Sequence, residues 1–168
     1  YDNFSPHQDI ISDRLRILSG LRDLKQGVLI APVSTVVQRL APAQWIQGNS
    51  FNLAVGDTLD LVAMQKRLTD AGYQRVDTVY EHGEFALRGA ILDVFPMGSN
   101  EALRIDLIDD EIDSLRHFDT ETQRTTTTID AIEILPAKEF PLDEAGISGF
   151  RKRWHERFDV DHRRCSVY

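Results

Sequence analysis

Apolar and polar residues alternate with a period of two in the middle of the chain. Residues 103–108 divide into an apolar set and a mixed set: Leu103, Ile105 and Leu107 against Arg104, Asp106 and Ile108. Because successive side chains of a strand point to opposite faces, this segment predicts a strand with one core face and one solvent face. Residues 112–118 predict a second strand, and the acidic run at 109–111 predicts the hairpin turn between them.

The hairpin belongs to a longer stretch, residues 82–118, that predicts four short strands joined by tight turns. Within it, residues 84–95 predict a long strand interrupted at Gly89, where a bulge costs little. A helix is predicted after Asp60, which can cap its start, and Gly72 closes it at the C′ position. The remaining predictions for this middle part are extended segments at 51–55, 74–80 and 129–135 and an exposed polar segment at 120–128.

The part before residue 51 predicts helices around one buried strand. Apolar residues recur at near-helical spacing over residues 9–24. The continuous apolar run at 28–33 is typical of a parallel strand that is buried on both faces. Next to it, residues 33–40 predict a helix with Ser34 as N-cap, which Pro42 ends. The polar segment at 47–50 predicts a linker.

These elements predict an α+β fold: a compact module with a curved antiparallel sheet and one main helix, flanked by α/β pieces. Residues 1–48 are predicted to be the C-terminal part of an α/β domain, and residues 49–136 the module itself. Residues 137–168 are predicted to start a following domain, and over 140–158 their pattern is that of an amphipathic helix.

Composition narrows the class of function. The net charge of −8, from 27 acidic and 19 basic residues, disfavours a DNA-coating role, which needs clustered Lys and Arg. One basic cluster, at 151–164, leaves nucleic-acid contact open beside the interpretation of a solvated helix face. The single cysteine, Cys165, fits a reducing cytoplasm, and the sequence has no apolar run long enough to span a membrane. A chain that begins at Tyr1 instead of methionine favours a fragment of a longer protein.

Sequence motifs for catalysis are missing. The sequence has no Gly-x-x-x-x-Gly-Lys-[Ser/Thr] loop for a nucleotide triphosphate and no Gly-x-Ser-x-Gly nucleophile elbow. Its five histidines are scattered, without a His-x-x-x-His pair or a Cys-x-x-Cys motif, so we expect no zinc site. The acidic run between Asp106 and Asp113 lacks the spacing and the glycine of a calcium loop, and we interpret it as a solvated hairpin turn.

The mixed face of the predicted sheet favours protein docking. Arg88 and Arg104 lie on neighbouring strands, Ile108 adds an exposed aliphatic side chain, and Arg116 can extend the patch. A guanidinium group presents a planar fork of donors suited to a partner carboxylate, and arginine is enriched among interface residues with large binding contributions. The alternative is that each arginine pairs with a cross-strand acid of the module itself, such as a neighbour of Asp106. A pure scaffold, whose sheet face packs against further chain, also stays open.

Three segments together resemble the UvrA-interacting domain of the nucleotide-excision-repair protein UvrB: LRGAILDVFP at 87–96, ALRID at 102–106 and DEIDSLR at 110–116. The opening YDNFSPHQDIIS resembles the transcription-repair coupling factors, the Mfd family. UvrB carries a long aromatic hairpin that this chain has no room for between Asp9 and Val28, which favours the Mfd family. The resemblance implies that residues 1–48 end a degenerate helicase-like domain without nucleotide binding.

The resemblance also implies the partner and the contact residues. The UvrA-contacting arginines of the family fall on Arg88 and Arg104, and a third contact, usually phenylalanine, falls on Ile108. The smaller side chain lowers the contribution of that position by on the order of 1 kcal/mol. Charge reversal at either arginine is expected to abolish UvrA binding while the fold survives.

For the parent protein, the resemblance implies an ATP-dependent DNA translocase that binds RNA polymerase and double-stranded DNA in the bacterial cytoplasm. ATP and Mg belong to domains outside this sequence, so this piece is expected to be a non-catalytic interaction fragment without a cofactor. A C-terminal domain of the same parent is implied to mask the UvrA surface. The competing hypothesis is a DNA-binding fragment of a UvrB-type helicase, which uses the basic cluster at 151–164 on phosphates.

Overall fold

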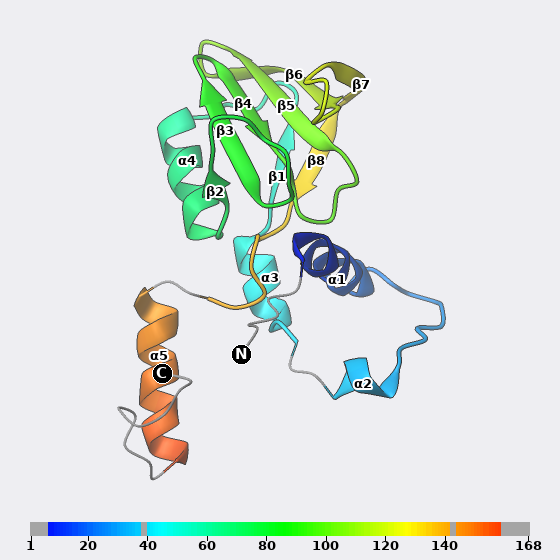
Figure 1. Cartoon of the computed structure of the whole chain (residues 1–168), viewed down its shortest axis with the longest axis vertical. Coiled ribbons are helices and arrows are strands. Elements are labelled where there is room, and N and C mark those ends of the chain that lie inside the picture. Colours follow the sequence, from blue (N-terminus) through cyan, green and yellow to red (C-terminus); the bar gives the residue numbers. More distant parts are fainter. Residues whose placement is uncertain (1–6, 38–39, 142–143, 159–168) are drawn as a thin grey trace.

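The computed structural model describes residues 7–37, 40–141 and 144–158 and shows the predicted α+β fold (Figure 1). The helices are α1 (Gln8–Leu21), α2 (Val33–Val36), α3 (Ala43–Asn49), α4 (Leu61–Asp70) and α5 (Glu144–Arg157). The strands are β1 (Phe51–Ala54), β2 (Gln74–Arg75), β3 (Glu84–Arg88), β4 (Ile91–Val94), β5 (Ala102–Ile108), β6 (Glu111–Phe118), β7 (Thr125–Ile129) and β8 (Ala131–Ile134).

The strands form two sheets. The larger sheet has the order β2-β3-β4-β5-β6-β7, and β1 pairs with β8 in a separate two-stranded sheet. All neighbours are antiparallel except β2 and β3, which run parallel over two residue pairs. The predicted hairpin of β5 and β6 is confirmed, and Asp109 takes a positive φ of 53° in its turn.

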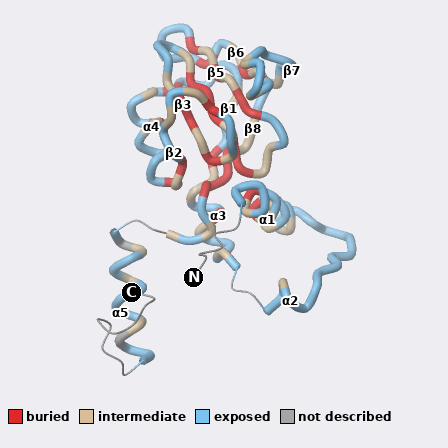
Figure 2. The backbone as a smooth tube through the Cα atoms, viewed as in Figure 1, coloured by how far each residue is buried: buried red, intermediate tan, exposed pale blue. Residues whose placement is uncertain are grey.

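The main core lies between the inner face of the larger sheet, the small sheet and α4 (Figure 2). The predicted apolar set of β5 is buried there, since Leu103, Ile105 and Leu107 are each at most 7% exposed. Helix α4 starts as predicted, because the Asp60 carboxylate accepts hydrogen bonds from two backbone N–H groups of its first turn. Gly72 follows its end with a φ of +95°, which glycine adopts without strain.

The predicted long strand over residues 84–95 is wrong. Residues Gly89 and Ala90 form a hairpin turn between β3 and β4, which pair with each other in antiparallel register. Gly89 has a φ of +62°, a conformation that suits a turn as well as a bulge. The single glycine therefore reverses the chain where the sequence predicted only an interruption, and the prediction of four short strands over residues 82–118 is correct.

The predicted buried strand at 28–33 is also wrong. Val28 and Ile30 are 88% and 90% exposed, and within the described residues neither sheet includes this segment. A strand buried on both faces needs neighbouring strands and covering layers, and an apolar run cannot supply these by itself. Among the described residues before 51, the regular elements are the helices α1, α2 and α3, and the assignment of this part to an α/β domain stays a prediction.

Two local predictions nearby are wrong, the N-cap at Ser34 and the linker at 47–50. Helix α2 begins after Pro32, so Ser34 lies inside the helix and not at its N-cap, and α2 ends at Val36. The predicted linker at 47–50 is instead the last turn of α3. Its end is fixed by the side chains of Asn49 and Ser50, which donate to backbone carbonyls one turn back at 2.8 and 2.7 Å.

Helix α1 confirms the predicted helix at 9–24, although it ends at Leu21, and it packs against the module. Leu15 is fully buried in the same cluster of side chains as Met97 and Leu135. The Ser12 hydroxyl accepts a hydrogen bond from the Gly98 backbone N–H at 2.8 Å. The first helix therefore shares the core of the sheet.

The end of the described chain matches the prediction in part. Residues 125–128 are exposed as predicted, but they form most of the edge strand β7. The last predicted strand is present as β8, and the amphipathic helix as α5. In α5 the Trp154 ring lies 5.6 Å from Phe150 and 4.5 Å from Phe158, measured between ring centroids. No helix among the described residues is long and apolar enough to cross a membrane.

Candidate functional site

The outer face of the larger sheet, on the side away from the main core, carries the predicted arginines. Asp93 on β4 lies directly opposite Arg104 on β5, which lies opposite Arg116 on β6. Arg88 on β3 joins the same face, since its Nη2 donates to Asp93. The prediction that Arg88 and Arg104 lie on one side of the sheet is therefore correct.

A second, smaller core covers one end of this face. It consists of side chains that are each at most 1% exposed, namely Val79, Ala86, Ala102 and Phe118. The other end stays open, toward the turn at Gly89 and Ala90. Ile108 lies at this open end and is 63% exposed, as predicted. The Leu107 N–H donates to the Ala90 carbonyl at 3.0 Å, so the tip of β5 lies beside the β3–β4 turn.

A buried carboxylate lies at the boundary between the covered and open ends. The Asp93 side chain is 1% exposed. Its Oδ1 accepts from Arg104 Nε at 2.7 Å, and its Oδ2 accepts from Arg104 Nη2 at 2.9 Å and from Arg88 Nη2 at 2.8 Å. Two guanidinium groups therefore share one carboxylate, and the cluster of these three side chains, here called the Asp93 cluster, has a formal charge of +1.

Arg104 is mostly buried and has three partners, Asp93, Phe118 and Gln123. Its side chain is 17% exposed, its Cζ lies 4.8 Å from the centroid of the Phe118 ring, and its Nη1 donates to the Gln123 carbonyl at 3.3 Å. The hydrogen bond to the Asp93 carboxylate raises the pKa of the Arg104 guanidinium above its ordinary value. For Arg104, the alternative of pairing with a cross-strand acid is therefore what the structure shows, and the acid is Asp93, not a neighbour of Asp106.

Arg88 and Arg116 are less enclosed. The Arg88 side chain is 50% exposed at the end of β3, and only its Nη2 reaches Asp93 within hydrogen-bonding distance. The Arg116 side chain is 38% exposed and pairs with Asp106, which also accepts from the Ser114 hydroxyl at 3.2 Å. Of the predicted contacts, Arg88 and Ile108 are thus the two that present most surface to a partner.

The sequence analysis did not identify Asp93 as a site residue. It therefore missed what the buried carboxylate implies for charge reversal at the arginines. A carboxylate flanked by the buried Leu92 and Val94 is a sequence signal for an internal ion pair, because a charge is buried only with a partner. Reversal of Arg104 would place a second carboxylate against Asp93. We therefore keep the expectation that the fold survives reversal only for Arg88, whose side chain is 50% exposed, and expect reversal of Arg104, which is 17% exposed, to destabilise the fold.

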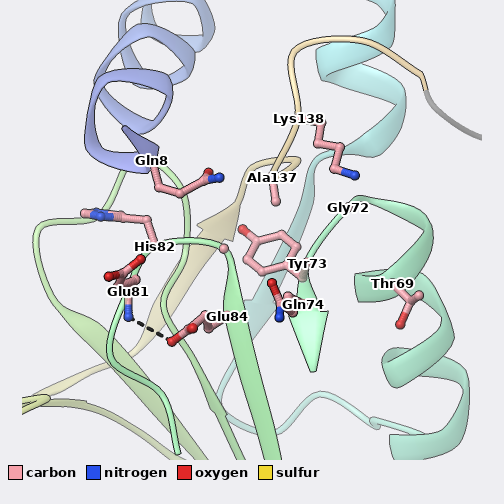
Figure 3. A pocket seen from close by; sticks show the side chains of 11 residues that line it. Gln8, Thr69, Gly72, Tyr73, Gln74, Glu81, His82, Glu84, Ala137 and Lys138 are labelled. Carbon is pink, nitrogen blue, oxygen red and sulfur yellow. Dashed lines mark hydrogen bonds between the residues drawn. The ribbon is translucent and has the colours of Figure 1, made fainter. Parts of the chain in front are cut away.

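A pocket of about 480 Å³ lies between the start of α1, the end of α4 and the strands β2 and β3 (Figure 3). Several of its polar side chains already have structural partners. The Tyr73 hydroxyl donates to the Leu135 carbonyl at 2.6 Å, and the Glu84 carboxylate accepts from the backbone N–H of Tyr80 and of Glu81. Burial raises the pKa of Tyr73, so its hydroxyl stays protonated.

The histidine of this pocket is also engaged. His82 Nδ1 lies 2.8 Å from Asp9 Oδ1, and its Nε2 lies 2.8 Å from the Ser99 carbonyl. The ring stacks on Phe95 at 4.0 Å between centroids. The pocket thus lies at the contact between α1 and the module. The side chains named here do not pair a general base with a nucleophile. Across the described residues, no group of three or more His, Cys, Asp or Glu side chains is placed to hold a metal ion.

The basic cluster predicted at 151–164 lies only partly in the described chain. Arg151, Lys152, Arg153 and Arg157 are exposed on α5, and residues 163 and 164 lie outside the described residues. The use of this cluster on nucleic acid stays a prediction.

Comparison with known proteins matches this chain to one domain family and to several transcription-repair-coupling factors. A family model described as "UvrB interaction domain" matches residues 51–140, more than half of the chain, and these residues include both sheets and α4. The chain is 51% identical over 160 residues to the transcription-repair-coupling factor of Escherichia coli (strain K12), and 51% identical over 158 residues to that of Haemophilus influenzae. It is 37% identical over 143 residues to that of Staphylococcus aureus (strain MRSA252).

These matches cover 95%, 94% and 85% of this chain but only 14%, 14% and 12% of the relatives, so the chain spans about one seventh of their length. The resemblance found in the sequence is confirmed. The strands that carry the Asp93 cluster lie within the matched region, and the chain belongs to the UvrB interaction domain family.

Proposed function

We propose that this chain is a non-catalytic interaction module of a transcription-repair coupling factor, and that it binds UvrA through the open end of its outer face. The observation that carries the proposal is the Asp93 cluster, which leaves one positive charge at the sheet surface and holds Arg88 half exposed. Family membership and the similarity to transcription-repair-coupling factors support this assignment.

The chemistry of the surface fits a protein partner with an acidic group. Arg88 can accept a partner carboxylate on the edge of its guanidinium that faces solvent, and Ile108 offers an apolar contact nearby. Arginine at the centre of an interface is a frequent site of large binding contributions, on the order of 2 kcal/mol on truncation. Arg116 is already paired with Asp106 and adds a smaller contribution at the edge of the patch.

For the parent protein we propose the role that its relatives' names describe, the coupling of repair to transcription. In this role the module recruits UvrA to RNA polymerase stalled at a lesion. ATP hydrolysis with Mg, DNA translocation and polymerase binding belong to other parts of the parent, and a C-terminal domain of the parent covers the outer face until UvrA is needed. In this proposal the boundaries near residues 48 and 136 delimit the part that carries the UvrA surface, and α1 packs against that part from outside it.

The test is a titration of purified UvrA against the 168-residue chain and two charge-reversal variants. Arg88→Glu is expected to weaken binding by about 30-fold or more, which corresponds to about 2 kcal/mol. The matched control is Arg16→Glu on α1, because the Arg16 side chain is also 50% exposed and also pairs with one acid. Equal affinity of Arg88→Glu and the unmodified chain would reject the proposal.

The exposed basic residues of α5 favour one second candidate, DNA binding. This function requires an affinity for DNA that falls steeply with salt, since phosphate contacts release counterions. A gel-shift series that shows no binding at low salt excludes it, and the net charge of −8 favours this result.

A further inference from the structure

Asp93 is a charged side chain inside an otherwise apolar strand. Its neighbours Leu92 and Val94 are each 1% exposed, as is Asp93 itself. A buried carboxylate needs a cation and hydrogen bonds, and Arg104 provides both through two donors at 2.7 and 2.9 Å. Arg104 alone therefore provides a cation and a hydrogen bond to each carboxylate oxygen, without the bond from Arg88.

The bond from Arg88 has a different effect. Arg88 is half exposed, and an exposed arginine without a fixed partner samples many rotamers, which must be lost when a partner binds. The bond of 2.8 Å to a carboxylate fixed within the sheet restricts these rotamers in advance. The carboxylate is itself restrained, because Arg104 donates to both of its oxygens.

Arg104 in turn has two further contacts besides Asp93. The Phe118 ring lies 4.8 Å from its Cζ, and the Gln123 carbonyl accepts from its Nη1. Gln123 ties the covering loops together, since its Nε2 donates to the carbonyls of Val79 and Thr120 at 3.2 and 2.6 Å. A chain of fixed contacts thus runs from the covered end of the outer face to Arg88 at the open end.

We propose that Asp93 is a positioning residue for partner binding: Arg104 holds its carboxylate, and the carboxylate orients Arg88 toward the partner. The inference rests on the proposed function, because it assigns roles within the same surface. The positive charge that remains on the Asp93 cluster makes a carboxylate the partner group that Arg88 takes.

A double-mutant cycle with purified UvrA tests the inference in the 168-residue chain. Asp93→Asn is expected to weaken binding by about tenfold, in the range seen when a residue that orients a contact is lost. In an Arg88→Gln background the same substitution is expected to change the affinity by less than about twofold, because the two residues act in series. Asp13→Asn, which removes the acid paired with the equally exposed Arg16, is the control and is expected to leave affinity unchanged.

A measurement on the unmodified chain covers the case in which Asp93→Asn does not fold. The Nε–H groups of Arg88 and Arg16 are compared by ¹⁵N relaxation, since both side chains are 50% exposed. Arg88 is expected to be the more ordered, because its carboxylate is buried whereas the Asp13 carboxylate is 65% exposed. Equal mobility of the two groups overturns the inference.

The outcomes separate this inference from the proposed function. If the unmodified chain does not bind UvrA, or if Arg88→Gln binds as well as the unmodified chain, the proposed function fails. If Arg88→Gln weakens binding but Asp93→Asn keeps its full effect in that background, the proposed function stands. In that case Asp93 acts through the fold alone, and the positioning role is wrong.

Discussion

Helix α1 is expected to be part of the same cooperative folding unit as the sheet, and Leu15→Ala tests this expectation. Leu15 is fully buried in the main core, although the sequence assigns it to a separate part that ends near residue 48. Truncation of a buried leucine to alanine typically costs about 3 kcal/mol, from lost transfer free energy and the cavity left behind. With a urea dependence of about 2 kcal/mol per M, the unfolding midpoint falls by about 1.5 M.

The assay is urea denaturation followed by circular dichroism, with Ile17→Ala as the control. Ile17 lies two positions further along the same helix and is 51% exposed, so its truncation is expected to change stability by no more than about 0.5 kcal/mol. If both variants unfold at the midpoint of the unmodified chain, α1 does not contribute to the unit. The burial of Leu15 would then contribute nothing to the free energy of unfolding, and residues 49–136 would fold without the helix.

Three further predictions concern the stability of the fold. Gly98→Ala is expected to destabilise the chain by about 2 kcal/mol, since φ is +83° and a Cβ would lie 2.8 Å from a leucine methyl. Gly20→Ala is the control and is expected to raise stability, because a Cβ at Gly20 would meet open space. Thermal melts compare the two variants. Tyr73→Phe is expected to cost about 2 kcal/mol at neutral pH, because two buried backbone groups lose their partner. The pKa of Tyr73 in the folded state is raised above its ordinary value of 10.0, so the contribution of its hydroxyl to stability is complete below that pH and is lost above it. The urea midpoints of the unmodified chain and of Tyr73→Phe should therefore converge as pH rises, and a constant gap between them contradicts this. Arg104→Leu is expected to cost about 3 kcal/mol in urea denaturation by leaving Asp93 with one half-exposed cation, and an unchanged midpoint would show that Arg104 does not stabilise the buried charge.

The sequence correctly predicted the elements that depend only on residues close together in the chain. The period of two placed Leu103 and Arg104 on opposite faces of one strand, and the structure agrees. Asp60 and Gly72 marked the two ends of α4 because a cap and a positive φ depend on a few adjacent residues. Two of the segments that carry the family resemblance, 102–106 and 110–116, lie in the correctly predicted hairpin, whereas the segment at 87–96 crosses the turn that the sequence did not predict.

Apolar runs were less informative, because burial depends on what lies next to a segment. The run at 28–33 has the composition of a buried strand, yet Val28 and Ile30 are almost fully exposed. Leu15 belongs to a helix that the sequence predicted correctly, but its burial against the sheet required the fold. The parallel pairing of β2 with β3 also has no local signal in two residues.

The sequence by itself determined that Arg104 and Ile108 lie on the outward side of their strand, since strand alternation fixes the side of each residue within a strand. The pairing of β3 with β4 and of β4 with β5 places Arg88 on the same side. Only the tertiary structure decided how these side chains differ. Strand register sets Asp93 opposite Arg104, and the loop that carries Gln123 covers that arginine, while Arg88 lies at the open end. The physical reason is that a charge inside a sheet takes the nearest opposite charge as its partner, and strand pairing, not sequence distance, determines which one is nearest.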